Sequence, residues 1–197
     1  MGVDERSLTV LFADVAGSTR LYEQLGDEKA LAAVGECLAL VERTAAGHAG
    51  RLIKTIGDEA MVVFPAAEQA AAAAAEIQGR MTDFAQAGNY RIAFRIGFHC
   101  GAAIERDGDV FGDSVNVAAR MVGLAKSGQV ILSAPTAETL SAALRERSIV
   151  VSAELLGRHL FLQRLRAPCA TERAAGADAL GRRQRDPARL TRRRAGQ

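Results

Sequence analysis

Two aspartates, Asp14 and Asp58, lie beside apolar segments that are typical of strands. Asp14 ends "LTVLFAD", and Asp58 lies inside "LIKTIGDEAMVVF". A carboxylate at the end of a buried strand costs free energy unless a cation or a partner neutralises it. Because hard divalent cations prefer oxygen ligands, the pair indicates a metal site of the kind that serves phosphoryl transfer. The alternative is that each aspartate only caps a turn or a helix.

The chain has 197 residues, is 49% apolar and carries a net charge of +2. This length and composition favour one substantial core. No uncharged apolar run reaches the roughly 18 residues of a membrane-spanning helix, and the first residues do not resemble a secretory signal. Three widely separated cysteines argue against a disulfide framework or a thiolate metal site. We therefore expect a cytoplasmic protein without a transmembrane segment.

The positive charge is concentrated at the C-terminal end. Residues 170–197 contain eight arginines against three acidic residues and almost no large apolar side chain. Such a segment cannot bury enough surface to fold alone. We expect a folded domain at residues 1–169 and a disordered Arg-rich tail at residues 170–197. Contact of this tail with nucleic acid or an anionic membrane is the alternative to a solvated tail, and no specific nucleic-acid partner is expected.

Strand and helix periods alternate along the first part of the chain. A strand ends at Asp14, and Ser18 or Thr19 is expected to cap a long helix that Gly47 and Gly50 stop. The apolar face expected for this helix consists of Leu31, Val34, Leu38, Val41 and Ala45. A hairpin turns at Ile56 and Gly57, and a helix follows over residues 66–87.

The second half begins with the clearest strand, residues 91–101, in which apolar residues alternate with small or polar ones. The small face contains Gly97 and Gly101, so another backbone, a ligand or a second subunit can approach it closely. The loop "ERDGDVFGD" and the helix "SVNVAARMVGLA" follow. After them we expect the strand "GQVILS", the short helix "APTAETLSAAL" and two weaker strands, "SIVVSAELL" and "HLFLQRL".

This order predicts an α+β fold: a ferredoxin-like or palm-type antiparallel sheet with helices packed on one side of it. Four segments in register, "FADVAGST", "KTIGDEAMVVF", "RIGFHCG" and "GDVFGDSVNVAARM", resemble the catalytic domain of class III adenylate and guanylate cyclases. The resemblance covers residues 8–133. It implies the nucleotide cyclase fold and makes residues 1–169 a cyclase catalytic domain.

The resemblance implies attack of a ribose 3′-hydroxyl on the α-phosphate, with pyrophosphate as the leaving group. Asp14 and Asp58, with the carbonyl of Val15, are then expected to hold two Mg²⁺ or Mn²⁺ ions per site. Main-chain amides at the following helix N-terminus are expected to bind the terminal phosphates. These amides belong to Ala16, Gly17, Ser18 and Thr19.

Four further residues match the family's substrate-binding positions. Lys54 and Asp109 match the purine-selecting pair, and a donor combined with an acceptor suits adenine better than guanine. Asn116 is expected to orient the ribose, and Arg120 to stabilise the α-phosphate in the transition state. Without the resemblance, an exposed strand lysine, a turn aspartate and a solvated helix pair would explain these residues equally well.

Family membership also implies an ATP-binding, head-to-tail homodimer with C2 symmetry and two shared sites. One chain would supply Asp14 and Asp58, and the other Lys54, Asp109, Asn116 and Arg120. The C-terminal segment "GRHLFLQRLRAPC" departs from the family pattern because it lacks a lysine, so Arg158, Arg164 or Arg166 is the expected substitute. The short "ERDGDVFG" loop predicts a modest dimer affinity.

The favoured function is therefore adenylate cyclase. Three alternatives stay open: a guanylate cyclase, a silent module that binds nucleotide or dimerises, and a diguanylate cyclase or polymerase palm. The last is favoured only by "GDEAMVVF", which lacks the second glycine of that family's hairpin.

Overall fold

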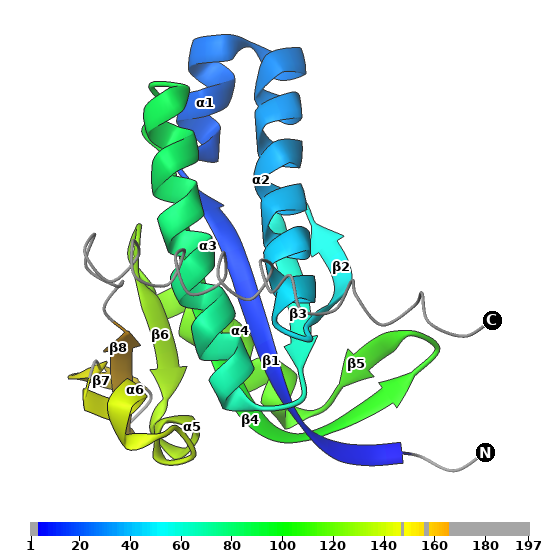
Figure 1. Cartoon of the computed structure of the whole chain (residues 1–197), viewed down its shortest axis with the longest axis vertical. Coiled ribbons are helices and arrows are strands. Elements are labelled where there is room, and N and C mark those ends of the chain that lie inside the picture. Colours follow the sequence, from blue (N-terminus) through cyan, green and yellow to red (C-terminus); the bar gives the residue numbers. More distant parts are fainter. Residues whose placement is uncertain (1–3, 147, 156–157, 166–197) are drawn as a thin grey trace, which may run out of the picture. The chain divides into compact units, whose positions relative to one another are not determined.

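A computed structural model describes residues 4–146, 148–155 and 158–165 (Figure 1). The tail expected at residues 170–197 lies outside this range, so its predicted disorder stays a prediction. The elements are β1 (Asp4–Ala16), α1 (Ser18–Leu25), α2 (Asp27–Gly47), β2 (Arg51–Ile56), β3 (Glu59–Phe64), α3 (Ala67–Ala87), β4 (Ala93–Arg106), β5 (Asp109–Phe111), α4 (Asp113–Leu124), β6 (Val130–Ser133), α5 (Ala134–Glu138), α6 (Ala142–Glu146), β7 (Ser148–Leu155) and β8 (Arg158–Leu165). No helix among these is long and apolar enough to cross a membrane.

One sheet runs through the domain in the order β2-β3-β1-β4-β6-β8-β7, and β5 pairs with β4. The long strand β1 is antiparallel to both of its neighbours, β3 and β4. The pair β4 and β6 is parallel, and the other pairs of described strands are antiparallel. The structure confirms the α+β class with helices packed on a largely antiparallel sheet.

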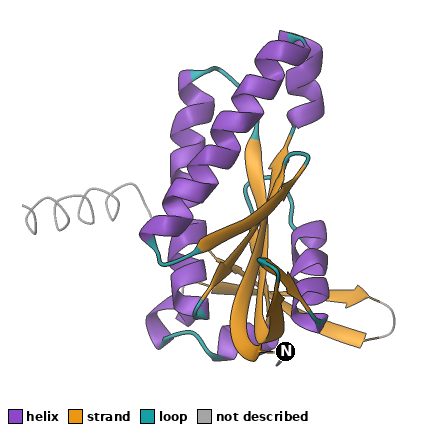
Figure 2. Ribbon diagram, turned by 90° about the vertical axis from the view of Figure 1, so that its right-hand side faces the viewer, coloured by secondary structure: helices purple, strands orange, loops and turns teal. Residues whose placement is uncertain are grey.

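The two faces of the sheet are covered by different helices (Figure 2). Alternate residues of β1, such as Leu11 and Ala13, face the main core that the sheet forms with α2 and α3. Val10 and Phe12 point the other way and pack with Ala118 of α4. The expectation of helices on one side is therefore wrong for α4, because its own apolar stripe requires a sheet face to cover it.

Helix α4 lies directly on β4 because Gly97 has no side chain. A Cβ atom at Gly97 would lie only 1.9 Å from the backbone nitrogen of Val122 in α4. A Cβ at Gly101 would meet the Ser114 hydroxyl at 2.5 Å. The expected close approach of a second backbone to this face is confirmed, and that backbone is α4 of the same chain.

Three expectations for the first helix are wrong. The helix is divided at Gly26 into α1 and α2, and Leu31 is 64% exposed rather than part of a buried face. Neither Ser18 nor Thr19 caps α1, since the N-cap is Gly17 with a φ of 94° and no side-chain cap. Gly17 is required here by conformation and by space, because a Cβ would lie 2.6 Å from the carbonyl oxygen of Arg91.

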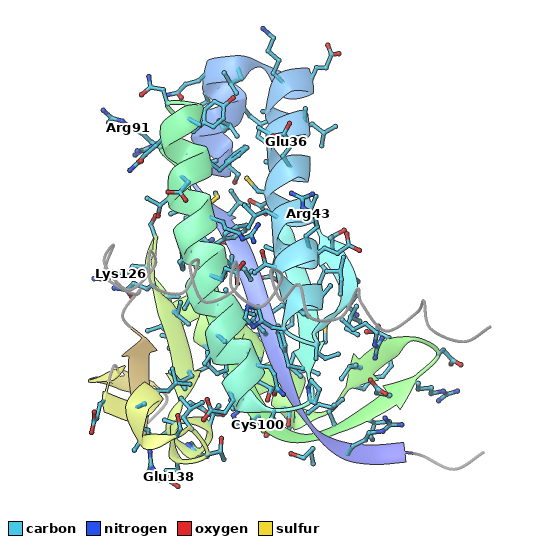
Figure 3. All side chains as sticks on the ribbon, in the orientation of Figure 1. Glu36, Arg43, Arg91, Cys100, Lys126 and Glu138 are labelled. Atoms are coloured by element: carbon cyan, nitrogen blue, oxygen red, sulfur yellow. The ribbon has the colours of Figure 1, made fainter. Side chains whose placement is uncertain are left out.

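The segment after β4 also differs from expectation. The sequence predicted a loop, but β5 pairs with the end of β4 as a hairpin around Asp107 and Gly108. Figure 3 shows that Arg91, just before β4, and Cys100, within it, lie towards opposite ends of the sheet. The carboxylates of the candidate site lie at the Arg91 end, where β1 finishes, whereas β5 pairs with the other end of β4.

Candidate active site

Asp14 lies near the end of β1 and is 8% exposed. The strand register places it opposite Glu59 of β3 on one side and Arg95 of β4 on the other. The Arg95 guanidinium donates from Nε to Asp14 Oδ2 at 2.6 Å, and a terminal nitrogen contacts the same oxygen. The buried carboxylate is thus neutralised by an arginine within its own sheet.

Asp58 lies in the tight turn between β2 and β3, next to Asp14. Its backbone carbonyl accepts a hydrogen bond of 3.2 Å from the Val15 amide. Its carboxylate Oδ2 accepts a hydrogen bond of 2.5 Å from Ser18 Oγ in the first turn of α1. The structure therefore brings together the end of β1, the hairpin turn and the start of α1.

Glu59 adds a third carboxylate beside these two aspartates. Its burial, followed by the nearby charges of Asp14 and Asp58, raises the pKa of Glu59, while Arg95 opposes the rise. The sequence did not indicate a role for Glu59 or Arg95 in the site. Arg95 was visible only as one polar residue on an alternating strand, and the β1–β4 register that pairs it with Asp14 depends on tertiary structure.

The donors present suit a hard divalent cation. Within the described part of the chain, no group of three His, Cys, Asp or Glu side chains is arranged to hold a metal ion. Magnesium is commonly bound by only one or two carboxylates, with waters and substrate phosphates as the remaining ligands. Asp14 and Asp58, with the main-chain carbonyl of Val15, fit that type of site.

The segment expected to bind phosphates connects β1 to α1. It contains Ala16, the N-cap Gly17, and Ser18 and Thr19 in the first helical turn, where backbone amides lack partners within the helix. A hollow of about 470 Å³ opens beside it, with Ser18, Thr19, Gly57 and Asp58 in its wall. The first turn of α1 therefore faces an open hollow next to Asp58.

Lys54 and Asp109 meet although they lie on different strands. Lys54 Nζ donates to Asp109 Oδ2 at 2.6 Å, and the Val110 amide donates to Asp109 Oδ1 at 2.8 Å. The hydrogen bond from Lys54 and then that from Val110 lower the pKa of Asp109. The contact confirms that the chain brings these two residues together, and it joins β2 to β5.

Exposed apolar side chains lie beside this ion pair. Ile56 and Phe111, two residues beyond Lys54 and Asp109 in their strands, are 54% and 48% exposed, whereas Phe12 is buried in the core at 4%. The Lys54 and Asp109 pair is therefore flanked by exposed apolar side chains on both of its strands.

Asn116 and Arg120 are both exposed on α4. They lie four residues apart within α4, so they share one face of the helix, as expected. The structure records no contact between them and the aspartates in the described part of the chain. The side chains proposed to replace the missing lysine, those of Arg158, Arg164 and Arg166, lie outside the part described in atomic detail.

The described residues form two groups: the carboxylates with the start of α1, and the Lys54–Asp109 pair with the exposed Asn116 and Arg120 of α4. A family model of the adenylate and guanylate cyclase catalytic domain matches residues 4–159. The chain belongs to this family. The match covers the described part of this cyclase domain except residues 160–165, which are most of β8.

Relatives agree with this assignment. The adenylate cyclase of Streptomyces coelicolor is 34% identical over 140 residues, which are 69% of this chain and 35% of the relative. The adenylate cyclase of Streptomyces griseus is 36% identical over 140 residues, which are 69% of this chain and 33% of the relative. The cyclase domain thus spans about a third of the length of these relatives.

A solved structure supports the same fold. The adenylate/guanylate cyclase/hydrolase from Silicibacter pomeroyi superposes with a TM-score of 0.73 at 27% identity. The superposition covers 85% of this chain and all of the other one. The sequence-based assignment to class III cyclases and to the nucleotide cyclase fold is confirmed.

Proposed function

We propose that this cyclase domain is an adenylate cyclase that converts ATP to 3′,5′-cyclic AMP and pyrophosphate. The observation that carries the proposal is the junction of β1 with the β2–β3 turn, where Asp14 lies opposite Glu59 and the neighbouring Val15 amide bonds to the Asp58 carbonyl. The contact between Lys54 and Asp109 supports adenine as the base. The adenylate cyclases of two Streptomyces species among its relatives favour the same substrate.

In this proposal Asp14, Asp58 and the Val15 carbonyl hold two divalent cations, Mg²⁺ or Mn²⁺. The bound ions supply Lewis-acid chemistry, which lowers the pKa of the 3′-hydroxyl and neutralises the phosphates. The amides of Ala16 to Thr19 donate to the terminal phosphates and orient pyrophosphate as it leaves. Ser18 also keeps the Asp58 carboxylate in one orientation through its 2.5 Å hydrogen bond.

The second group of residues reads the nucleoside. Lys54 donates to a ring nitrogen of adenine, and Asp109 accepts from its exocyclic amine. These hydrogen bonds to the base replace part of the contact between Lys54 and Asp109. Asn116 holds the ribose so that its 3′-oxygen faces the α-phosphate in line with the leaving group. The Arg120 guanidinium donates to the α-phosphate oxygens, where negative charge is concentrated in the transition state.

We propose that the two groups act on one nucleotide only when they come from different chains of a head-to-tail homodimer. Arg95 holds Asp14, whereas Lys54 is turned toward β5 and Asp109. The exposure of Ile56, Phe111, Asn116 and Arg120 leaves that half of the surface open to a second chain. Since each chain carries both groups, a C2 dimer contains two equivalent sites.

One assay tests the proposed activity. Purified protein is incubated with ATP or GTP and Mg²⁺ or Mn²⁺, and cyclic products are separated from linear ones. We expect cyclic AMP, and a loss of at least about 10³-fold in Asp58→Asn because a key electrostatic group is removed. Asp83→Asn, an exposed change on α3, serves as the matched control and should retain activity.

Three results would contradict the proposal in different ways. If cyclic GMP is the main product, the substrate is GTP rather than ATP, and the assignment to nucleotide cyclases still holds. If Asp58→Asn keeps full activity, Asp58 is not a ligand of the catalytic metal ions. No cyclic product under any condition would favour a silent module that binds nucleotide.

A further inference from the structure

Arg95 and Asp14 form an ion pair that the sheet itself imposes. They are direct cross-strand partners in the β1–β4 register, so their side chains leave the same face. Two nitrogens of the guanidinium converge on a single oxygen, Asp14 Oδ2, with Nε at 2.6 Å. The Asp14 side chain is 12% exposed and that of Arg95 is 43% exposed.

Asp58 is held in a different manner. Its carboxylate accepts from the neutral hydroxyl of Ser18 at 2.5 Å, which orients the group without compensating its charge. Asp14 is compensated by a full positive charge. The two aspartates that we assign to the metals therefore differ before any metal arrives: one has a cationic partner and the other a neutral donor.

Arg95 opposes the binding of a divalent cation to Asp14 in two ways. The two guanidinium N–H groups occupy lone pairs of Oδ2 that a metal would use. The positive charges of Arg95 and the metal also repel each other, and this repulsion is weakly screened at a largely buried group. Metal binding at Asp14 must therefore displace the guanidinium or share the carboxylate with it.

We propose that Arg95 is a resident counter-ion of Asp14 that competes with divalent cations and thereby sets the metal affinity of the site. Arg95 stabilises the buried carboxylate while no metal is bound and lowers the affinity for the metal when it binds. In this role Arg95 acts through Asp14, as a positioning and tuning residue. This role rests on the proposed assignment of Asp14 to the metals.

Calorimetric titration of the full chain with Mn²⁺, without nucleotide, tests the proposal directly. Arg95→Gln removes the charge, and we expect it to tighten Mn²⁺ binding at least about fivefold, because a nearby repulsive charge is lost. The control is Arg51→Gln, which also removes one positive charge from an arginine paired with a carboxylate, here Glu105 at 2.5 Å. Since Arg51 does not contact the aspartates, the control should change Mn²⁺ affinity less than about twofold.

Arg95→Lys supplies a graded comparison. Its ammonium keeps the charge but is a compact point charge that does not offer the bidentate fork of a guanidinium. We expect an affinity for Mn²⁺ between those of the wild type and Arg95→Gln. If circular dichroism shows that Arg95→Gln does not fold, this variant decides the question, and an affinity no higher than that of the wild type overturns the proposal.

Thermal unfolding gives a second readout that does not depend on catalysis. Arg95→Gln leaves Asp14 buried without its cation, so its unfolding midpoint should fall in the absence of metal. Saturating Mn²⁺ should then raise this midpoint by more than it raises that of the wild type. Equal increases in the two proteins would overturn the proposal.

Asp14→Asn separates this proposal from the proposed function. If Asp14→Asn weakens Mn²⁺ binding but Arg95→Gln leaves it unchanged, the counter-ion role is wrong and the metal assignment survives. If Asp14→Asn leaves Mn²⁺ binding unchanged, both the metal assignment and the counter-ion role are wrong.

Discussion

Lys54 Nζ of β2 lies 2.6 Å from Asp109 Oδ2 of β5, a contact that joins residues 55 positions apart in the sequence. The β4–β5 hairpin makes a second contact with β2 through Arg51 and Glu105 at 2.5 Å. The hairpin is therefore fixed against the edge of the sheet at two points. The contact places a donor of β2 beside an acceptor of β5, the pair that the proposed adenine site would use.

The first prediction concerns the choice of base. Wild-type protein should prefer ATP over GTP by roughly 5- to 150-fold, because guanine leaves both Lys54 and Asp109 without suitable partners. The double change Lys54→Glu with Asp109→Cys should erode this preference, and total activity should fall because the pair also holds the base in position. Initial rates of cyclic AMP and cyclic GMP formation measure both effects. Equal rates with the two nucleotides in the wild type would contradict the assignment.

The second prediction concerns the shared site. Asp14→Ala and Arg120→Ala should each be inactive alone, but a heterodimer of the two should contain one intact site and one site with both lesions. Mixing the proteins should therefore restore activity, up to about half of the wild-type value per heterodimer. Differently tagged chains, purified together, establish that the heterodimer has formed. An inactive heterodimer would show that the two groups of residues do not act across chains.

The third prediction concerns the packing of α4. Gly97→Ala should lower the free energy of unfolding by at least about 2 kcal/mol, since overpacking a dense interior forces the backbone to shift. The added methyl group would meet the Val122 nitrogen at 1.9 Å. Urea denaturation measures the change. Gly123→Ala in α4, where a Cβ meets nothing within 4 Å, is the control and should be neutral or slightly stabilising.

Activity should fall with Gly97→Ala as well, because α4 carries Asn116 and Arg120. The loss should exceed that in Gly123→Ala under conditions in which both proteins are folded. If Gly97→Ala unfolds at the same urea concentration as the wild type, the direct contact between α4 and β4 is wrong.

The fourth prediction concerns pH. His99 Nδ1 shares a hydrogen bond of 2.6 Å with Ser133 Oγ, and burial lowers the pKa of His99 below its usual value of 6.5, with Asp113 opposing the shift. A lowered pKa means that the folded state binds this proton less readily than the unfolded state. The stability from neutral His99 is thus fully present above about pH 6.5 and is lost as the pH falls through the folded pKa.

His99→Asn removes this titration and keeps a polar group near Ser133. Between pH 7.5 and pH 5.5 its unfolding temperature should therefore fall less than that of the wild type, as measured by circular dichroism. Carboxylates titrate in both proteins, so the difference between the two curves isolates His99. Parallel curves would mean that protonation of His99 does not affect stability.

The sequence alone determined the family and most of the elements, although it missed β5 and the division between α1 and α2. Alternation of apolar and polar residues indicated β4, and apolar runs next to turn residues indicated β1 and β3, because these patterns are visible within a single strand. The four motifs named the cyclase family, which the family model and the relatives confirm. These inferences succeeded because they depend on local periodicity and on short segments.

Tertiary structure decided what depends on distant residues. The apolar stripe of α4 shows that this helix is packed on one side, but it does not show which face of the sheet it covers. The helical periodicity expected from Ser18 to Gly47 likewise does not show that the chain breaks at Gly26 into α1 and α2. The exposure of Leu31 follows from where α2 lies on the sheet, which helical spacing does not specify. Hydrophobic periodicity describes a single helix or strand, whereas the sheet face that α4 covers and the exposure of Leu31 depend on how helices pack against the sheet.

The same division applies to the site. Asp14 and Asp58 were visible as carboxylates beside strands, but their neighbours Arg95, Glu59 and the Ser18 hydroxyl became clear only when register and turn geometry were fixed. Ser18 looked like a helix cap, yet Gly17 takes the cap position and the hydroxyl bonds to Asp58 instead. The sequence therefore identified the two aspartates, whereas the pairing of the strands decided which cation neutralises Asp14. A shift of one residue in the strand register would give every residue a different cross-strand partner.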